Sequence, residues 1–272
     1  MRIIRFLDEK DQVCFGHKYQ DGFATLLEGR LFAQLKDTGS QVRVKKLLAP
    51  LEPAAILCIG LNYSQHARET GLKLPAYPAL FMKNPAALAH PEDPIVLPSS
   101  CLDPFQVDYE VELAVVIGTP ARNVPAEAAF QYVLGYTIAN DVSARRWQRH
   151  AGAGQWIRGK SFDTFCPLGP MLVTPDEIPD PQNLQLKCIL NGITMQDAST
   201  SEMIFPVVEL IKYLSTDMTL LPGTVILTGT PSGVGFSREP AVYLKPGDVV
   251  ESTIEGIGTL VNPVRAAESL TE

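Results

Sequence analysis

The sequence predicts a mixed α/β protein that is mostly β, with a small β-rich N-terminal domain over residues 1–48 and a larger domain over residues 49–272. Three observations support this class. Short apolar segments recur between Gly, Pro, Asn and Asp turns, as strands do. The 22 prolines and 20 glycines suit many strands and turns better than a helical bundle. The segment KKLLAPLEP, residues 45–53, carries two prolines and is typical of a linker between two domains.

Composition and charge exclude several classes of protein. The 272 residues are 46% hydrophobic and 19% charged, as in an ordinary globular protein. The formal net charge of −7, without a basic stripe, argues against nucleic acid as a partner. No apolar run approaches the roughly 20 residues of a membrane span, and the first residues lack a signal-peptide core. The five cysteines form no C-x-x-C pair, so we expect buried thiols in a reducing, cytoplasmic protein.

The expected elements alternate strands with a few short helices. Strands are expected over residues 2–7, 12–19, 22–29, 54–60, 107–118 and 134–141, between a turn and a glycine-rich loop within 221–235, in a hairpin over 184–197, and as a terminal pair within 244–264. Helices are expected over residues 61–71, 121–133, 142–151 and 201–216, the last interrupted near Pro206. An extended, proline-punctuated segment covers residues 75–85.

The strand VDYEVELAVVIG carries the first candidate site. Asp108, Glu110 and Glu112 alternate, so their side chains share one face of the strand. Such a pattern is common on a solvent-facing strand, and that is the simpler interpretation. The following LAVVI, however, is apolar at every position and predicts burial on both faces. Because buried carboxylates need partners, a hard divalent cation is a candidate partner here.

Asp141 ends one expected strand and begins the next expected helix, where Arg145 and Gln148 fall on one face. Asp141 is suited to cap that helix, and Arg145 to form an i,i+4 ion pair with it. The functional alternative places Asp141 on a metal ion, with Arg145 and Gln148 directed at a substrate carboxylate or carbonyl.

His66 and Glu69 are spaced i,i+3 on a short helix and can meet. A surface contact is the simpler interpretation of this pair. The functional interpretation is a dyad in which His66 acts as a general base on water. The loop that follows the pair, residues 71–78, suits a mobile lid.

Lys160 and Thr230 complete the candidate residues. Lys160 lies between Gly and Ser in a loop and is either a surface lysine or a donor to a developing enolate oxygen. The glycine-rich loop TGTPSGVG, residues 228–235, matches neither a Walker A loop nor G-x-G-x-x-G, but Thr230 in it can donate its hydroxyl to a small ligand. No zinc-type histidine motif is present, so a carboxylate site favours Mg²⁺, with Mn²⁺ or Ca²⁺ as alternatives.

Taken together, these segments resemble the fumarylacetoacetate hydrolase family over about residues 50–264. The matching segments stand in the family's order: GLNYSQHARE, PALFMKNP, VDYEVELAVVIG, GYTIANDVSARRWQ, GKSFDTFCPLGP and LTGTPSGVG. The resemblance implies a mixed β-roll and a homodimer. It also implies a role for each candidate: metal ligands Glu110, Glu112 and Asp141; catalytic residues His66, Glu69 and Lys160; substrate-binding residues Arg145, Gln148 and Thr230.

The resemblance leads to three functional hypotheses. The first is a Mg²⁺-dependent hydrolase that cleaves a C–C bond of an acylpyruvate-like 2,4-diketo acid through a metal-bound enolate. The second is an oxaloacetate enol–keto tautomerase or decarboxylase that uses the same site. The third, from another class, is a metal- and carboxylate-binding protein without turnover. The stretch IGLNYSQ lacks the acid that the founding hydrolase carries before its catalytic histidine, which argues against fumarylacetoacetate as the substrate.

Overall fold

A long, mixed sheet is the largest structural element of the molecule. In this computed structural model, residues 1–149 and 156–268 are described, and within them one sheet contains 12 strands. Across the sheet these are β4 (Leu35–Arg43), β3 (Phe23–Gly29), β2 (Val13–Gln20), β1 (Arg2–Leu7), β14 (Cys166–Val173), β12 (Val133–Asn140), β11 (Val111–Ile117), β17 (Thr224–Leu227), β6 (Ala55–Gly60) and β7 (Ala79–Lys83), with β5 (Lys46–Leu48) beside β1 and β8 (Leu88–Ala89) beside β14.

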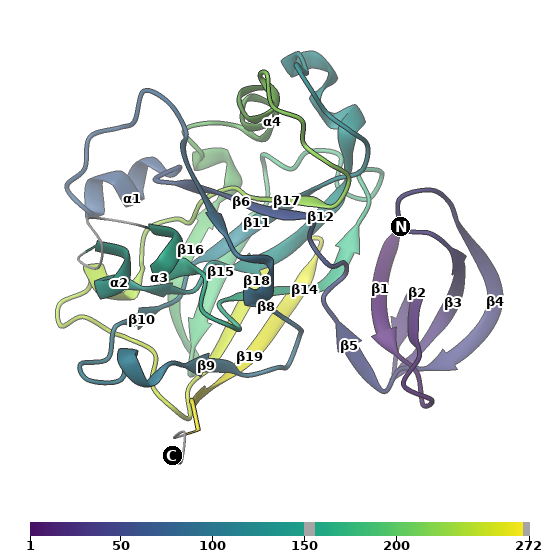
Figure 1. Ribbon diagram of the computed structural model, residues 1–272, viewed down its shortest axis with the longest axis horizontal. Coiled ribbons are helices and arrows are strands. Elements are labelled where there is room, and N and C mark those ends of the chain that lie inside the picture. Colours follow the sequence, from purple (N-terminus) through teal and green to yellow (C-terminus); the bar gives the residue numbers. More distant parts are fainter. Residues whose placement is uncertain (150–155, 269–272) are drawn as a thin grey trace.

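A second sheet packs against the first and encloses the main hydrophobic core. Its order is β16 (Ile193–Ser199), β15 (Gln185–Leu190), β18 (Val249–Ile254), β19 (Gly258–Ala266) and β9 (Ile95–Leu97). A short pair, β10 (Val107–Asp108) and β13 (Ser143–Ala144), stands apart from both sheets. Figure 1 shows β19 near β14, and these two strands, one from each sheet, are in contact. The mostly β class predicted from the sequence is confirmed.

The helices are short and lie outside the sheets. They are α1 (Ser64–Glu69), α2 (Arg145–Arg149), α3 (Trp156–Lys160) and α4 (Val207–Ser215), with 3₁₀ turns η1 (Pro85–Ala87), η2 (Ser99–Cys101), η3 (Ala126–Tyr132), η4 (Thr200–Glu202) and η5 (Gly235–Ser237). Helices α1, α2 and α3 gather at the end of the molecule away from β1–β4 (Figure 1). No helix in the described ranges is long and apolar enough to cross a membrane.

The N-terminal strands form a lobe of their own that stays joined to the large sheet. Strands β1–β4 make an antiparallel meander, visible at one side of Figure 1. The edge of β1 pairs with β14 through Arg2–Val173 and Ile3–Leu172, so this lobe extends the sheet of the larger part. The expected linker over residues 45–53 contains a strand, β5, because Lys46–Leu48 pairs with β1. The division at residue 48 stays a prediction.

Two of the expected helices differ from the structure. Residues 142–151 were expected to be helical, but Ser143 and Ala144 pair with β10 as a strand, so α2 begins only at Arg145; residues 150 and 151 lie outside the described ranges. The expected helix over residues 121–133 is a 3₁₀ turn, η3, preceded by Pro125.

Two further expectations are confirmed. The hairpin turns at Asn191 and Gly192, whose positive φ angles of 52° and 80° match the turn that Asn-Gly favours. The helix expected over residues 201–216 is confirmed in its second part, because α4 begins directly after Pro206, which lacks the N–H that a helix interior needs; before it, residues 200–202 form the 3₁₀ turn η4.

The strand directions explain why distant loops meet. Strand β11 runs antiparallel to β12 and to β17, and β17 runs parallel to β6. The carboxyl ends of β6, β12 and β17 therefore lie at the sheet edge where β11 begins. The segments that follow these three strands contain α1, α2 and the glycine-rich loop over residues 228–235. One edge of the sheet thus collects the chain segments that carry most candidate residues.

A substitution at the centre of β11 tests this core. Leu113 is fully buried in a strand whose seven residues are all buried. Leu113→Ala is expected to lower the free energy of unfolding by about 2–5 kcal/mol, because it removes buried methyl groups and leaves a cavity. Leu221→Ala, at a leucine that is 56% exposed, is the matched control and should change it by less than about 0.5 kcal/mol. Denaturant unfolding measures both, and equal effects would contradict the described core.

Candidate metal and catalytic site

Three carboxylates meet at the sheet edge where β11 begins. Strand register places Val111 opposite Asn140, so Glu110 and Glu112 lie beside Asp141 at the end of β12. The backbone N–H of Asp141 donates to the carbonyl oxygen of Glu110 over 2.8 Å, which fixes the two chain segments together. One carboxylate oxygen from each of the three residues lies within 4.8 Å of the others, and all three residues are buried.

Two buried lysines neutralise part of this negative charge. Lys160 Nζ donates to Glu110 Oε2 over 2.7 Å and to Asp141 Oδ2 over 2.6 Å. Lys83 Nζ donates to the other oxygen of Asp141 over 2.5 Å. Burial opposes ionisation of Glu110, but the positive charges of Lys160 and Arg145 outweigh it and lower the pKa of Glu110 to about 2. Glu110 is therefore ionised at neutral pH.

Glu112 lacks such a partner, and this makes the set fit a metal ion. Its Oε2 accepts a hydrogen bond from the backbone N–H of Gly229 over 2.7 Å. In the described part of the chain, no cationic side chain lies within ion-pair distance of Glu112. Burial, followed by the charges of Asp141 and Glu110, raises the pKa of Glu112 well above its usual range. A divalent cation held by the three carboxylate groups would relieve this repulsion, and oxygen ligands suit a hard cation.

Arg145 connects the carboxylates to a fourth buried acid. Its Nε and Nη2 lie 2.9 and 2.8 Å from Asp108 Oδ2, and its Nη1 lies 2.7 Å from Glu110 Oε1. Asp108 also accepts hydrogen bonds from the backbone N–H groups of Gly235 and Phe236. Arg145 Nη1 donates to Gln148 Oε1 over 3.1 Å, which orients the Gln148 amide. Arg145 thus pairs with Asp108 and Glu110 rather than with Asp141, the local pair that its spacing suggests.

His66 and Glu69 form the expected pair on α1. His66 Nδ1 lies 3.1 Å from Glu69 Oε2, and the second oxygen of Glu69 accepts from the backbone N–H of Gly233 over 2.9 Å. Burial opposes ionisation of Glu69, but hydrogen bonds that include those from His66 and Gly233 lower its pKa. Glu69 is thereby an anchored, ionised partner for Nδ1, and Nε2 is the imidazole nitrogen left to act on a ligand.

Thr230 is held by strand β11 and by the second sheet. Its hydroxyl donates to the carbonyl oxygen of Val111 over 3.0 Å and accepts from Gln196 Nε2 over 2.8 Å. Gln196 in turn accepts from the backbone N–H of Val111. Because its proton points to Val111, the Thr230 hydroxyl presents mainly its oxygen to the cavity in this arrangement.

These residues surround one cavity of about 130 Å³. Seven of the nine predicted residues line it: His66, Glu110, Glu112, Arg145, Gln148, Lys160 and Thr230. The other two lie behind the wall, where Glu69 holds His66 and Asp141 holds Lys160. Apolar side chains form the rest of the wall, including Phe81 and Trp156, whose rings meet edge to face at 5.3 Å. With a divalent cation on the carboxylates, the arrangement could hold a small anionic molecule beside the histidine.

Three residues that build this site have no role predicted from the sequence. Lys83 lies in the segment PALFMKNP. A lysine within this extended apolar segment is the sequence signal that could have marked it as a site residue. Asp108 was noted only for sharing a face with the glutamates, yet it is the main partner of Arg145. Phe236 follows the glycine-rich loop and lies within 4.4 Å of the guanidinium carbon of Arg145, and no sequence pattern marked it.

The chain is similar to known proteins over most of its length. Residues 55–265 match the family model described as fumarylacetoacetate (FAA) hydrolase C-terminal. The fumarylacetoacetate hydrolase domain-containing protein 2 homolog of Dictyostelium discoideum is 48% identical over 229 residues, 81% of this chain and 74% of that protein. The oxaloacetate tautomerase FAHD2A, mitochondrial, of Bos taurus is 48% identical over 218 residues, 80% of this chain and 68% of that protein.

A solved structure is similar over nearly the whole chain. The crystal structure of 5-carboxymethyl-2-hydroxymuconate delta-isomerase from Mycobacterium smegmatis has a TM-score of 0.84 and 40% identity, covering 98% of this chain and all of that one. The bovine relative bears a mitochondrial name, which does not fit the plain cytoplasmic location expected from the sequence. The compartment of this chain stays a prediction, as does the homodimer.

The metal ligands can be tested by a single conservative change. Glu112→Gln keeps the side-chain volume but removes the charge, so Mg²⁺ or Mn²⁺ affinity is expected to fall at least about tenfold. Isothermal titration calorimetry of the purified protein measures the dissociation constant. Glu127→Gln, at an exposed glutamate in η3, is the control and should leave metal affinity unchanged. A Glu112→Gln protein that binds metal like the unaltered chain would remove Glu112 from the site.

Proposed function

The chain belongs to the fumarylacetoacetate hydrolase family and is an enzyme of that family, and we propose that it moves a proton between the enol and keto forms of oxaloacetate or a closely similar 2-oxo acid. The observation that carries the proposal is one cavity lined by His66, Lys160, Glu110 and Glu112, with a carboxylate oxygen of Asp141 within 4.8 Å of an oxygen of each glutamate. This proton transfer needs a group that stabilises the negative charge of an enolate and a base beside it. A metal ion would supply the first, and His66 would supply the second.

Mg²⁺ is the proposed metal, held by Glu110, Glu112 and Asp141. All three ligands are carboxylates, and hard oxygen donors favour Mg²⁺ or Mn²⁺ over softer metals. When bound there, the ion would supply Lewis-acid stabilisation of enolate charge. Lys160 would add to it, because its ammonium group lies between Glu110 and Asp141 and its pKa is raised by their charges against the opposing effect of burial. Lys160 therefore acts as a fixed positive charge and hydrogen-bond donor, not as a base.

Arg145 and Gln148 are proposed to orient the carboxylate of the substrate. Arg145 is held by Asp108 and Glu110, so its guanidinium group cannot rotate away from the cavity wall. The Gln148 oxygen accepts from Arg145, which turns the Gln148 NH₂ group outward as a donor. A donor fixed in this way binds a carboxylate oxygen without losing further side-chain freedom.

His66 is proposed to carry the proton. Its Nδ1 faces Glu69, so its Nε2 takes the hydroxyl proton of the enol and delivers a proton to C3, and the reverse reaction retraces these steps. The atoms balance because one proton leaves oxygen and one joins carbon. The imidazolium that forms between the two steps is stabilised by the ionised Glu69 carboxylate.

The names of two similar proteins support tautomerisation. One of the relatives is named an oxaloacetate tautomerase and the similar solved structure an isomerase. Both names describe rearrangements without loss of a fragment. Hydrolysis of an acylpyruvate is the second candidate, supported by the His66–Glu69 pair, which can equally take a proton from water.

In the second candidate reaction, the oxygen of that water would bond to the distal carbonyl carbon. The C–C bond would then break with its electron pair passing to the 2-oxo acid fragment, which takes up a proton. The same residues would serve both reactions, so substrate assays are needed to separate them.

One assay distinguishes the two candidates. Purified protein with Mg²⁺ is given enol-oxaloacetate or an acylpyruvate, while ultraviolet absorbance reports loss of the enol and a coupled assay reports pyruvate. The proposal expects enol-oxaloacetate to become keto-oxaloacetate without release of pyruvate. Rapid pyruvate release from the acylpyruvate, with no acceleration of tautomerisation, would favour the hydrolase instead.

The proton-carrying role of His66 has its own test. His66→Asn is expected to lower kcat for tautomerisation by about 10²- to 10⁴-fold, the usual contribution of a general acid–base group. Mg²⁺ affinity should be unchanged, because His66 is not among the proposed ligands. His17→Asn, in β2 of the N-terminal lobe, is the control and should keep full activity. Full activity in His66→Asn would contradict the assignment.

A further inference from the structure

Helix α2 brings a second arginine to the cavity wall. Arg145 and Arg149 both line the cavity and stand one helical turn apart, about 6 Å along the helix axis. The guanidinium carbon of Arg145 lies 4.4 Å from the centre of the Phe236 ring, and that of Arg149 lies 4.0 Å from it. Both distances are in the range of cation–π contacts. The Phe236 ring thus fixes the positions of the two guanidinium groups relative to each other.

The two arginines differ in what they bind within the protein. The guanidinium group of Arg145 is buried and paired with Asp108, Glu110 and Gln148. Arg149 is exposed, and within residues 1–149 and 156–268 no carboxylate lies within ion-pair distance of it and its side chain donates no hydrogen bond. Burial and then the charge of Arg145 lower the pKa of Arg149.

Lys160, the remaining cation that lines the cavity, is already paired with carboxylates. Lys160 is held between Glu110 and Asp141. Of the lysines and arginines that line the described cavity, Arg149 therefore keeps a positive charge that no described carboxylate neutralises. A guanidinium group in this state is a ready binding partner for the carboxylate of a ligand, because its planar fork matches two carboxylate oxygens.

We propose that Arg149, supported by Phe236, is the residue that selects 2-oxo acids with a second carboxylate, by binding the carboxylate farther from the 2-oxo group. This rests on the proposed function, in which Arg145, Gln148 and the metal ligands take the 2-oxo acid end. The one-turn offset of Arg149 from Arg145 provides a second anion position a few ångströms farther out, within reach of a short dicarboxylic acid.

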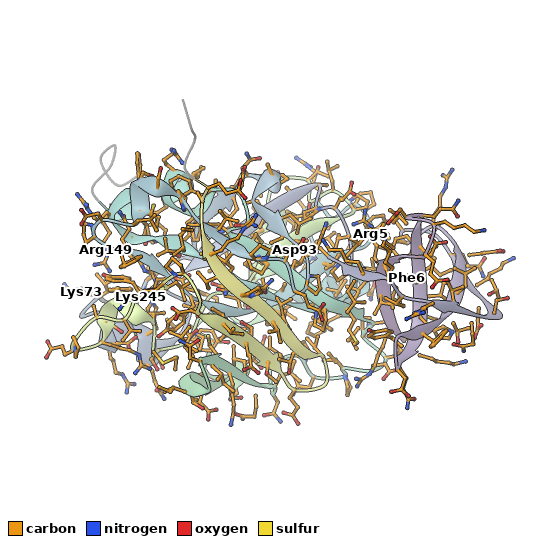
Figure 2. All side chains as sticks on the ribbon, turned by 90° about the horizontal axis from the view of Figure 1, so that it is seen from below. Arg5, Phe6, Lys73, Asp93, Arg149 and Lys245 are labelled. Atoms are coloured by element: carbon orange, nitrogen blue, oxygen red, sulfur yellow. The ribbon has the colours of Figure 1, made fainter. Side chains whose placement is uncertain are left out.

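The position of Arg149 at the mouth of the cavity suits this role. Figure 2 shows Arg149 at the end of the molecule away from the N-terminal lobe, the same end at which Lys73 and Lys245 are labelled. Both lysines are exposed. Arg149 and these two lysines place positive charge at this end of the molecule.

Binding of two matched acids tests the proposal without depending on turnover. 2-Oxoglutarate and 2-oxopentanoate have the same chain length and differ only in the distal carboxylate. Calorimetric titration of the full chain in the presence of Mg²⁺ is expected to show at least about tenfold tighter binding of 2-oxoglutarate. In Arg149→Gln this preference should disappear, with 2-oxopentanoate binding within twofold of the unaltered protein. Arg149→Lys should recover part of the preference.

Arg146→Gln is the matched control, since Arg146 is exposed on the same helix but does not line the cavity. It removes the same charge and should keep the full preference. An unaltered protein without the preference, or an Arg149→Gln protein in which both acids weaken equally, would overturn the proposal. If the preference depends on Arg149 but no tautomerase activity is found, the proposed function fails and the role of Arg149 stands.

Discussion

The site depends on the burial of several like charges at one sheet edge. Asp108, Glu110, Glu112 and Asp141 are buried together with three cationic side chains, Arg145, Lys83 and Lys160. Isolated buried carboxylates are strongly disfavoured, so each must be paired or must bind a cation. Pairing is complete for three of the four acids, and Glu112 is the exception. Four buried carboxylates face three buried cationic side chains, and this excess of one negative charge favours binding of a divalent cation at this edge.

The fold produces this concentration of charge through strand direction. The first residues of β11 lie beside the last residues of β12, which brings Glu110 to Asp141 despite the 30 positions between them. Strands β6 and β17 end at the same edge and deliver His66 and Thr230. The interior of β11, buried along its whole length, anchors the arrangement in the core. Strand β11 therefore contributes to both the site and the stability of the fold. Its first residues position the site, and its centre packs in the core.

Local pattern predicted part of this site, and nonlocal pairing decided the rest. Alternation placed Glu110 and Glu112 together, and i,i+3 spacing placed His66 against Glu69. The partner of Arg145 could not be predicted, because local spacing favours Asp141 while the fold supplies Asp108 from 37 residues away. The role of Lys83 depends on a similar long-range contact with Asp141.

The same limit applies to the fold. Most strands followed from apolar runs and turn residues, but pairing between distant segments overrode local preference. Lys46–Leu48 forms a strand within an expected linker because β1 lies beside it. Ser143 leaves the expected helix because β10 lies beside it. The contact between Arg149 and Phe236 could not be predicted for the same reason, since it joins two segments that no local pattern connects.

The central claim is that Glu110, Glu112 and Asp141 hold one divalent cation. A crystal structure of the protein grown with Mn²⁺, with data collected at the manganese absorption edge, tests it most directly. The account predicts a single strong anomalous peak about 2.1 Å from one oxygen of each of the three carboxylates. A peak at any other place in the molecule, with the three carboxylates bound only to Lys83, Lys160 and backbone groups, would contradict it.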